Sequence, residues 1–411
     1  MGLRFLRRRS ALLAVLLLLV GLTVWLGVSL AIRQQPTGLA VSIQPISAWS
    51  VQLRISVPNR AAAVQIRRGN LAIDRFAVQG AGTILYTDYQ LWPSTSYAYV
   101  VDAVDQRGAL LTRRQIKVRT PTVSGSFPLL YASSSFWNSP IGPTDTVDSS
   151  STLMVQGGLV QDAADANLAN SDQWGIAVAY ANAADQTYGI GCSRYDCDHA
   201  VTFRIPSSAA PTAGSDHHLS VVDPGQRAEL DTWLAAYDSR SGTWTAGSRY
   251  ITSTDGWGAI CGVGQHCGGA VASGFAELGG IIRPEEIAQG HIDHALFLTL
   301  PHVSLGVIAC PATGTDGNDN DPTAIPEGAR LQLDPALDVD GQPWPRWEKI
   351  VARTLQRYGA YVGDTGGSLA IRAEATLNRG YDAWALAGVP ISPSLTNIPW
   401  GRFRVLQITT C

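Results

Sequence analysis

The stretch that decides the fold runs from Asp216 to Tyr237 and reads DHHLSVVDPGQRAELDTWLAAY. Residues 218–223 form a short β-rich run, and residues 228–237 form a second run with strand-like alternation. Pro224-Gly225 between them is a turn dipeptide. The stretch therefore predicts a β-hairpin, around which the larger part of the chain is organised.

Side chains of a strand point alternately to its two faces. This alternation places His218, Asp231 and Trp233 on one face of the predicted hairpin, with Asp216 at its edge. Carboxylates, an imidazole and an aromatic platform on one sheet face suit a sugar-binding cleft. An ordinary hairpin with a solvated polar side is the alternative interpretation.

The composition excludes some classes of function. The chain has 411 residues, of which 45% are hydrophobic and 15% charged, with a net charge of -3. This length allows more than one domain. A slightly negative net charge gives no electrostatic attraction for the phosphates of nucleic acid. The 12 tryptophans and 41 glycines fit a secreted β-rich protein with aromatic binding surfaces.

The N-terminus predicts a membrane segment. Four arginines at positions 4, 7, 8 and 9 precede an uncharged apolar run over residues 11–32, which is long enough to cross a bilayer. We favour an uncleaved signal anchor over a signal peptide cleaved near Ser29-Leu30-Ala31. Either interpretation places the rest of the chain outside the cytoplasm, anchored to the membrane or secreted.

The six cysteines agree with an oxidising compartment. The economical pairing is Cys192–Cys197, Cys261–Cys267 and Cys310–Cys411. A zinc site that draws on the first four cysteines with His199 or His266 is the alternative, although the spacings are wider than in the usual zinc knuckle.

Residues 37–121 form the first predicted module. Seven short alternating runs with turns between them predict a sandwich. The segment LWPSTSYAYVVDAVD at 91–105, closing on VRTP at 118–121, resembles a fibronectin type III domain through its Leu-x-Pro-x-Thr-x-Tyr corner and late-strand tyrosine. The resemblance implies a spacer or binding module without catalytic residues.

Residues 122–134 are a linker, and residues 135–411 form the larger predicted domain after the cytoplasmic flank and anchor at 1–36. An early helical segment is expected within residues 151–170, and further helices over 284–289 and 347–358. The remaining pattern is mostly strands, which favours a jelly-roll-type β-sandwich. The chain as a whole is therefore predicted to be mostly β.

The larger domain also resembles an uncharacterised family of secreted bacterial proteins. The matching motifs are short: Phe136-Trp137-Asn138, Asp216-x-His218, Asp231-x-Trp233, Gly256-Trp257, Gly279-Gly280-Ile281-Ile282-Arg283, His294-Ala295-Leu296, Pro326-x-Gly328-Ala329-Arg330-Leu331, and Tyr358-Gly359 before Asp364. The resemblance implies an architecture and a set of positions, not an activity.

The hairpin acids suggest cleavage of polysaccharide. Glycosidases use two carboxylates that are ~5–9.5 Å apart, and neighbouring strands lie ~4.8 Å apart. Asp231 and Asp216 are therefore the candidate catalytic pair of a glycoside hydrolase, with His218 orienting one of them. Trp233 and Trp257 are the candidate sugar platform. No cofactor is required for this reaction.

Two other functions remain open. A polysaccharide lyase would use His218 or His294 with Tyr250 and Arg283 as base and cationic groups. In the hydrolase, His294, Arg283 and Tyr250 would instead bind substrate. A non-catalytic glycan-binding or cell-wall-binding protein would keep the aromatic residues and tolerate Asp231→Asn.

One loop resembles a calcium-binding sequence. Asp316, Asn318, Asn320 and Glu327 reproduce the oxygen-bearing positions 1, 3, 5 and 12 of a calcium loop. Asp321 stands where that loop requires glycine, and a plain turn rich in Asp and Asn is the alternative. A structural calcium ion is thus a secondary prediction.

Overall fold

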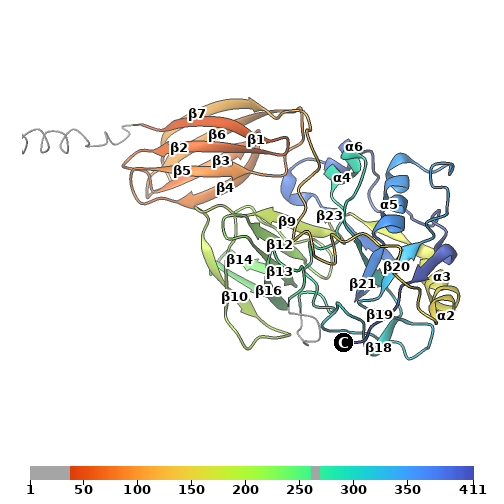
Figure 1. Cartoon of the computed structure of the whole chain (residues 1–411). Coiled ribbons are helices and arrows are strands. Elements are labelled where there is room, and N and C mark those ends of the chain that lie inside the picture. The colour runs from red at the N-terminus through yellow and green to blue at the C-terminus, as the bar shows by residue number, and fades with distance from the viewer. Residues whose placement is uncertain (1–37, 261–268) are drawn as a thin grey trace, which may run out of the picture.

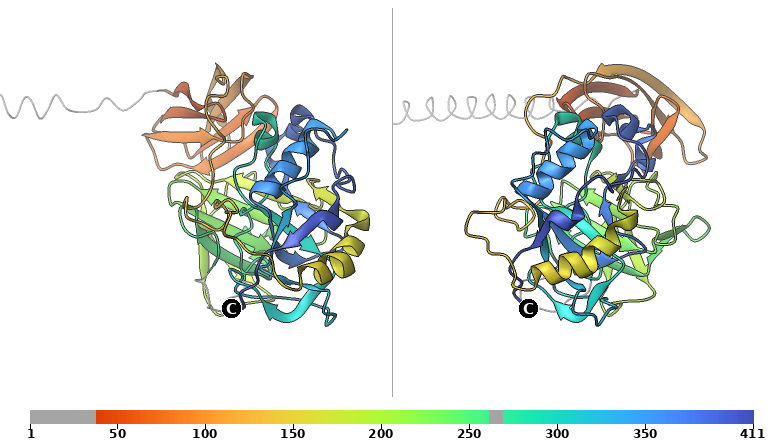
Figure 2. Two further views of the ribbon diagram at one scale, coloured as in Figure 1. Left: turned by 45° about the vertical axis from the view of Figure 1, so that its right-hand side comes forward. Right: turned by 90° about the vertical axis from the view of Figure 1, so that its right-hand side faces the viewer.

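A computed structural model describes residues 38–260 and 269–411. The predicted N-terminal anchor and the predicted Cys261–Cys267 pair lie outside the described residues. Among the helices that are described, none combines the length and apolarity needed to cross a membrane. An N-terminal module (residues 38–121) packs against a larger region (residues 135–411), as Figures 1 and 2 show.

The N-terminal module is a sandwich of two antiparallel sheets. One sheet contains β1 (Ala40–Ser47), β2 (Ser50–Val57) and β5 (Gly82–Asp88). The other contains β4 (Leu71–Ala77), β3 (Ala63–Arg68), β6 (Ser96–Val104) and β7 (Leu110–Arg119). Their inward side chains form one apolar core, and the seven predicted strands are confirmed.

The corner before β6 is closed by Tyr97, whose hydroxyl accepts a 2.7 Å hydrogen bond from the Trp92 amide. The next inward residue, Tyr99, donates a 2.6 Å hydrogen bond to Asp88 in the opposite sheet. These contacts explain why this segment of the sequence carries its tyrosines at alternate positions.

The predicted hairpin lies at the centre of a five-stranded sheet in the larger region. The order is β16 (Ser248–Ser253), β13 (Ala228–Trp233), β12 (Leu219–Asp223), β9 (Ile176–Tyr180) and β23 (Glu374–Ala375). Ser220 pairs with Asp231 across the hairpin, which confirms it. The returning strand is shorter than predicted, because Leu234 adopts φ 53° and turns the chain away.

A four-stranded sheet packs against one face of that sheet through a shared apolar core. It contains β11 (Val201–Arg204), β10 (Thr187–Cys192), β15 (Thr243–Ala246) and β14 (Ala236–Asp238). β14 uses the residues after Leu234 that were predicted to extend the hairpin. The hairpin therefore contributes its second strand to one sheet and the following residues to another.

A six-stranded sheet completes the larger region. The order is β24 (Phe403–Val405), β20 (Arg330–Leu333), β21 (Ala360–Thr365), β17 (Leu296–Leu300), β22 (Ala370–Arg372) and β8 (Asn167–Ala169). β18 (Val303–Ile308) and β19 (Ile325–Glu327) pair separately.

Helices cover the six-stranded sheet. They are α2 (Ser151–Met154), α3 (Val160–Asp162), α4 (Pro284–Gln289), α5 (Arg346–Arg357) and α6 (Ala383–Ala387). α5 and the α2–α3 segment lie over the sheet (Figure 2), and Val351 and Leu159 share a core with Leu298. The three predicted helical segments are confirmed, although α2 and α3 are joined by one π-helical stretch, Val155–Leu159.

The chain is mostly β, as its sequence predicts. Several pairs in the larger region are parallel, among them β9 with β12, β17 with β21, and β8 with β22. Parallel pairs need long crossovers, which the strand pattern alone does not show.

Two of the predicted disulfides, Cys192–Cys197 and Cys310–Cys411, are present. Cys192 and Cys197 are therefore not free to bind zinc as thiolates. The bonds indicate that this part of the chain folds in an oxidising, extracellular-type compartment.

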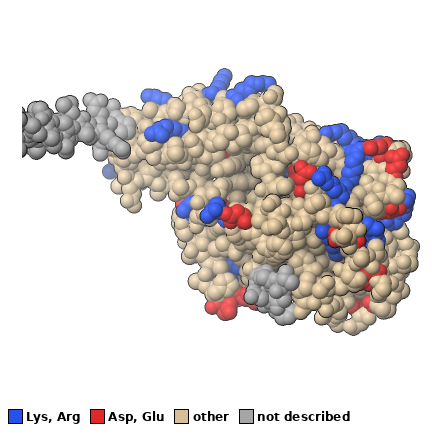
Figure 3. Space-filling view, viewed as in Figure 1, with Lys and Arg blue, Asp and Glu red and all other residues tan. Residues whose placement is uncertain are grey.

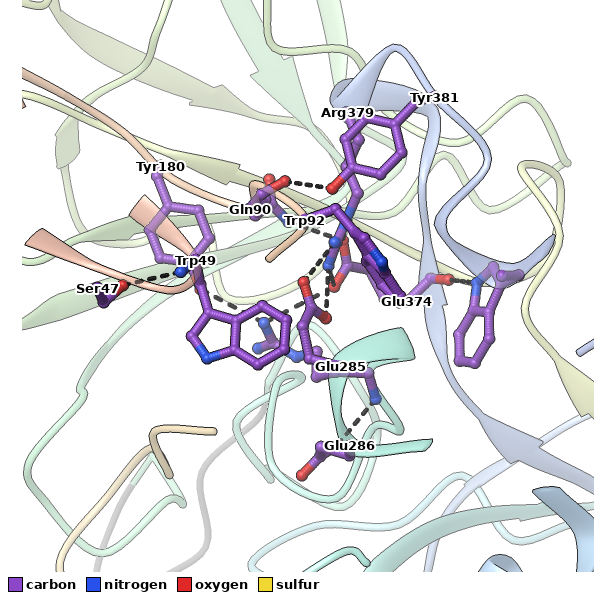
Figure 4. A network of polar contacts seen from close by, with 12 residues as sticks. Ser47, Trp49, Gln90, Trp92, Tyr180, Glu285, Glu286, Glu374, Arg379 and Tyr381 are labelled. Carbon is purple, nitrogen blue, oxygen red and sulfur yellow. Dashed lines mark hydrogen bonds and ion pairs between the residues drawn. The ribbon is translucent and has the colours of Figure 1, made fainter. Parts of the chain in front are cut away.

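The module is held to the larger region by partly buried polar contacts. Gln90 of the module donates a 2.7 Å hydrogen bond to Glu374, and Tyr381 donates one of 2.7 Å to the Gln90 carbonyl. Glu374 and Glu285 converge on the guanidinium of Arg379, which is 1% exposed (Figure 4). This network fixes the docking face of the module.

Candidate functional site

A groove of ≈ 1260 Å³ opens between the five-stranded and six-stranded sheets. Its aromatic wall contains Trp174, Tyr195 and Trp233. Its titratable lining side chains are Asp196, Asp216, His218, Asp316, Asp364 and Arg372. Charged side chains of both signs are present on the face seen in Figure 3. The groove is thus the place where polar and aromatic groups meet on a large concave surface.

The aromatic wall is built partly by a disulfide-closed loop. Tyr195 lies between Cys192 and Cys197, and its ring stacks on Trp233 with centroids 5.8 Å apart. Trp174 is 52% exposed and Tyr195 62%. Large aromatic faces left open to water beside a groove are suited to stacking on sugar rings.

His218 is held from behind by a buried acid. Its Nδ1 forms an ion-pair contact with Glu277 Oε1, and Glu277 is fully buried. Among the described residues, Nε2 makes no hydrogen bond, so this nitrogen is left to serve the groove. The pairing fixes the ring orientation in the way that carboxylates orient functional histidines.

Arg372 and Asp364 form the floor. Arg372 forms an ion pair with Asp364, lies 3.5 Å from Glu277 Oε1, and packs over the Phe297 ring at 4.6 Å. Burial raises the pKa of Asp364 to about 6, although the Arg372 guanidinium acts in the opposite direction. Asp364 therefore exchanges its proton near neutral pH while it lines the groove.

A second carboxyl group lies beside Asp364. Asp316, Glu327 and Asp364 each place a carboxylate oxygen within 4.8 Å of the others. Asp316 is exposed and accepts a 2.7 Å hydrogen bond from the Thr365 hydroxyl. Burial and the Asp364 charge raise the pKa of Glu327 to about 9, so Glu327 is protonated at neutral pH. Asp316, which is exposed, and Asp364, which is half-buried, are therefore the two carboxyl groups of this cluster that line the groove.

The predicted site residues do not all lie in the groove. Asp216, His218 and Trp233 line the groove. Asp231 is fully buried behind it: its Oδ2 accepts the Glu277 amide at 3.0 Å, and its Oδ1 accepts the Ser220 hydroxyl at 2.6 Å.

Burial and the charges of Glu229 and Glu277 raise the pKa of Asp231 well above its usual range. Asp231 thus lies on the predicted face of the hairpin, but the segment around Glu277 covers it. The expectation that it forms an open catalytic pair with Asp216 is corrected, because a buried protonated acid without groove exposure cannot reach a sugar.

The remaining predicted binding residues lie elsewhere. Tyr250 is buried and donates its hydroxyl hydrogen to Asp196 of the groove. Trp257 stands edge-on to Phe136 with centroids 5.6 Å apart and is not part of the groove lining. Arg283 and His294 line a different cavity, at the junction with the N-terminal module.

The predicted calcium loop assembles only in part. Asn318 accepts the Val303 amide through Oδ1 and donates to the Pro301 carbonyl through Nδ2, so its side chain is engaged in shaping the turn. Asn320 is exposed. Asp316 and Glu327 do meet, but their third partner is Asp364. Within the described part of the chain this acidic trio is the set with the geometry to hold a cation.

Sequence reasoning missed Glu277, Asp364 and Arg372. A signal for Asp364 existed, because it is the second-last residue of a strand that begins with four buried residues, and Gly366-Gly367 follows that strand as a turn at which polar groups often face a ligand. Nothing in the spacing of Glu277 or Arg372 reveals that they meet, since β22 and the segment before α4 are brought together only by the fold.

No family model matches the chain, and no curated protein does. Among solved structures, the chain is similar to the sixth fibronectin type III domain of human fibronectin type III domain containing protein 3, with 20% identity over 23% of this chain and 95% of that chain, at a TM-score of 0.18.

Two bacterial structures also show similarity. One is the family 28 exopolygalacturonase of Yersinia enterocolitica, at 12% identity over 54% of this chain and 46% of that chain, with a TM-score of 0.19. The other contains the fibronectin(III)-like modules of Clostridium thermocellum CbhA, at 10% identity over 53% of this chain and 95% of that chain, with a TM-score of 0.15. The fibronectin type III similarity to the human domain covers a small part of the chain.

Proposed function

We propose that the groove binds a polysaccharide and hydrolyses its glycosidic bonds outside the cytoplasm. The observation that carries the proposal is the pair of groove carboxyl groups, Asp316 and Asp364, whose oxygens approach within 4.8 Å in the groove that also holds the aromatic wall. Retaining glycosidases place their two carboxyl groups ~5–5.5 Å apart, whereas inverting enzymes need a wider gap for water. The spacing therefore favours retention of configuration.

The two acids take different parts in the reaction. Protonated Asp364, whose pKa is raised to about 6, gives its proton to the glycosidic oxygen as the Asp316 carboxylate attacks the anomeric carbon. The carbon–oxygen bond to the leaving sugar breaks, and the remaining sugar is held as an ester on Asp316. Asp364, now ionised, removes a proton from water, which attacks the anomeric carbon and releases Asp316.

Positioning residues surround the pair. Thr365 holds the Asp316 carboxylate by its hydroxyl at 2.7 Å and its amide at 3.3 Å. Arg372 holds Asp364 from the other side and is itself supported by Glu277. His218 is paired with the same Glu277 and lines the groove, where it can form a hydrogen bond with a sugar hydroxyl. The catalytic groups are thus fixed by a supporting network.

The charge of the groove favours a neutral glycan. Asp196, Asp216 and Asp316 line it together with Asp364, while Arg372 is already paired. A polyanionic chain would meet several carboxylates at close range, and each such approach is repulsive. The proposed substrate is accordingly a neutral or cationic polysaccharide, and no nucleic acid is expected to bind.

One observation favours a polysaccharide lyase as a second candidate. The His218–Glu277 pair leaves Nε2 open, and Arg372 stands on the same floor, which is the combination of base and cation that β-elimination needs. A lyase produces unsaturated ends that absorb in the ultraviolet, so the two reactions are distinguishable by product. The acidic lining makes hydrolysis the better-supported proposal.

The proposal includes a location outside the cytoplasm. The disulfides support an oxidising compartment. Anchoring to the membrane rests on residues 11–32 of the sequence, which lie outside the described residues. Separation of membranes from culture supernatant, followed by detection of the chain, tests the anchor directly.

The test of activity uses the full chain in mild detergent with a panel of polysaccharides. Reducing ends and ultraviolet absorbance are followed in parallel, with Asp364→Asn as the matched variant. New reducing ends without absorbance, lost in the variant, support the hydrolase. Absorbing products support the lyase. Binding of a glycan with no product, equal in both proteins, would replace the enzyme proposal by a glycan-binding one.

A further inference from the structure

A second cavity lies at the junction of three parts of the chain, separate from the groove. This junction pocket has a volume of ≈ 420 Å³. Its walls include Trp49 of the N-terminal module, Phe127 and Leu130 of the linker, and Tyr180, Arg283 and His294 of the larger region. The volume is within the range of pockets that bind small organic ligands. Most of the wall is apolar, and its charged or titratable residues other than tyrosines are Arg283, Glu286 and His294.

Arg283 is a buried cation with unused donors. Its side chain is 6% exposed, and in the described part of the chain it donates one hydrogen bond, of 3.4 Å, to Tyr180 Oη. Glu374 Oε2 lies 3.8 Å away, and both Glu374 oxygens already accept shorter bonds, of 2.7 and 2.8 Å, from Arg379. Glu374 therefore supplies counter-charge but no good hydrogen bond, whereas a guanidinium has five N–H groups to satisfy.

His294 does not supply the missing acceptor. Its Nδ1 lies 2.8 Å from the Ala295 carbonyl and its Nε2 lies 2.9 Å from Glu286 Oε1. Burial lowers the pKa of His294, but Glu286 and the carbonyl raise it by more, so the ring is favoured as a cation paired with Glu286. The other Glu286 oxygen accepts the Arg283 amide at 2.8 Å. Both oxygens of Glu286 are thus engaged away from the Arg283 guanidinium.

We propose that the junction pocket binds a small organic anion, with one carboxylate-sized head on an apolar body. The head would accept hydrogen bonds from the Arg283 guanidinium, which is the strongest class of hydrogen bond available to a buried cation. The body would lie among Trp49, Phe127 and Leu130. The ring of Trp49 meets that of Phe127 edge-on at 5.6 Å, so module and linker together form an apolar wall.

Such a ligand would contact the module, the linker and the larger region at once. Phe127 is fixed to the larger region through a 2.6 Å hydrogen bond from its amide to Gln289. Figure 4 shows Trp49 and Tyr180 beside the buried Arg379 network that joins the two parts. Binding would therefore add to the contacts that hold the module in place, independently of any reaction in the groove.

The test is calorimetric titration of the full chain with octanoate, octanol and octylammonium, which share an apolar body and differ in head charge. Octanoate should bind at one site per chain, at least tenfold more tightly than the other two. Arg283→Gln, which keeps much of the side-chain size, should weaken octanoate at least tenfold, while Arg372→Gln in the groove should leave it unchanged.

Equal binding of the three compounds, no binding of octanoate, or loss of binding in Arg372→Gln rather than Arg283→Gln would overturn the proposal. Because the comparison of head groups uses the unaltered protein, it decides the question even where Arg283→Gln fails to fold.

Discussion

Replacing Arg372 by methionine should shift the alkaline limb of the pH–rate profile to higher pH. Asp364 must carry a proton to act as the acid, so kcat/KM should fall as the pH rises through its pKa of about 6. Arg372 forms an ion pair with Asp364 and lowers that pKa. Without the guanidinium, Asp364 keeps its proton to higher pH, and the variant should stay active where the unaltered protein has lost activity.

The size of the shift follows from the contact. Opposite charges ~4 Å apart interact by ~4 kcal/mol at an effective dielectric of ~20, which corresponds to ~3 pKa units. Asp364 is 17% exposed, so groove water screens part of this interaction. The expected shift is therefore about 1–2 pH units, the lower part of the range known for an Asp beside an Arg.

The assay is kcat/KM against pH on the best substrate of the panel. Arg402→Met is the matched control, because it removes the partner of a surface acid, Asp334, and neither residue lines the groove. That variant should leave the profile unchanged. An Arg372→Met profile with its alkaline limb in the same place, or at lower pH, would refute the role given to Asp364.

Three further predictions concern the groove, the junction and metal dependence. Gly367 lines the groove, and a Cβ there would meet nothing within 4 Å. Gly367→Phe should therefore fill groove space and lower kcat/KM at least tenfold, while the melting temperature stays the same. An unaltered kcat/KM would show that the substrate binds elsewhere. Arg379→Met leaves Glu285 and Glu374 buried without their partner, so it should lower the free energy of unfolding by about 3–5 kcal/mol in urea titrations. The surface variant Arg402→Met should lower it by under ~1 kcal/mol. Similar losses in both variants would contradict the role given to the Arg379 network. Activity should survive a chelator, because the proton held by Glu327 rather than a cation allows the three acids to lie close together. Terbium luminescence together with chelator-sensitive activity would contradict this prediction.

The hairpin shows what a single sequence can establish. Alternation on both sides of Pro224-Gly225 predicts the strand pair, and the register of Ser220 against Asp231 agrees with it. The end of the second strand could not be foreseen. The alternation continues past Trp233, but a left-handed residue at Leu234 sends the chain into another sheet.

The candidate site was harder to predict for a physical reason. A period of two assigns Asp231 to a face but does not say what covers that face, and here the Glu277 segment does so. Asp364 and Arg372 reach the floor because β21 and β22 flank β17, one in parallel and one antiparallel. That arrangement depends on crossovers that leave no trace in the spacing of residues.

The most direct measurement compares three single variants on one substrate that the unaltered protein cleaves. Asp364→Asn and Asp316→Asn should each lower kcat at least a thousandfold, because each removes a group that bonds to the reacting atoms. Asp231→Asn should keep activity within about tenfold, since it replaces a buried carboxyl that already holds its proton. Full activity in either groove variant, with activity abolished in Asp231→Asn, would contradict the assignment.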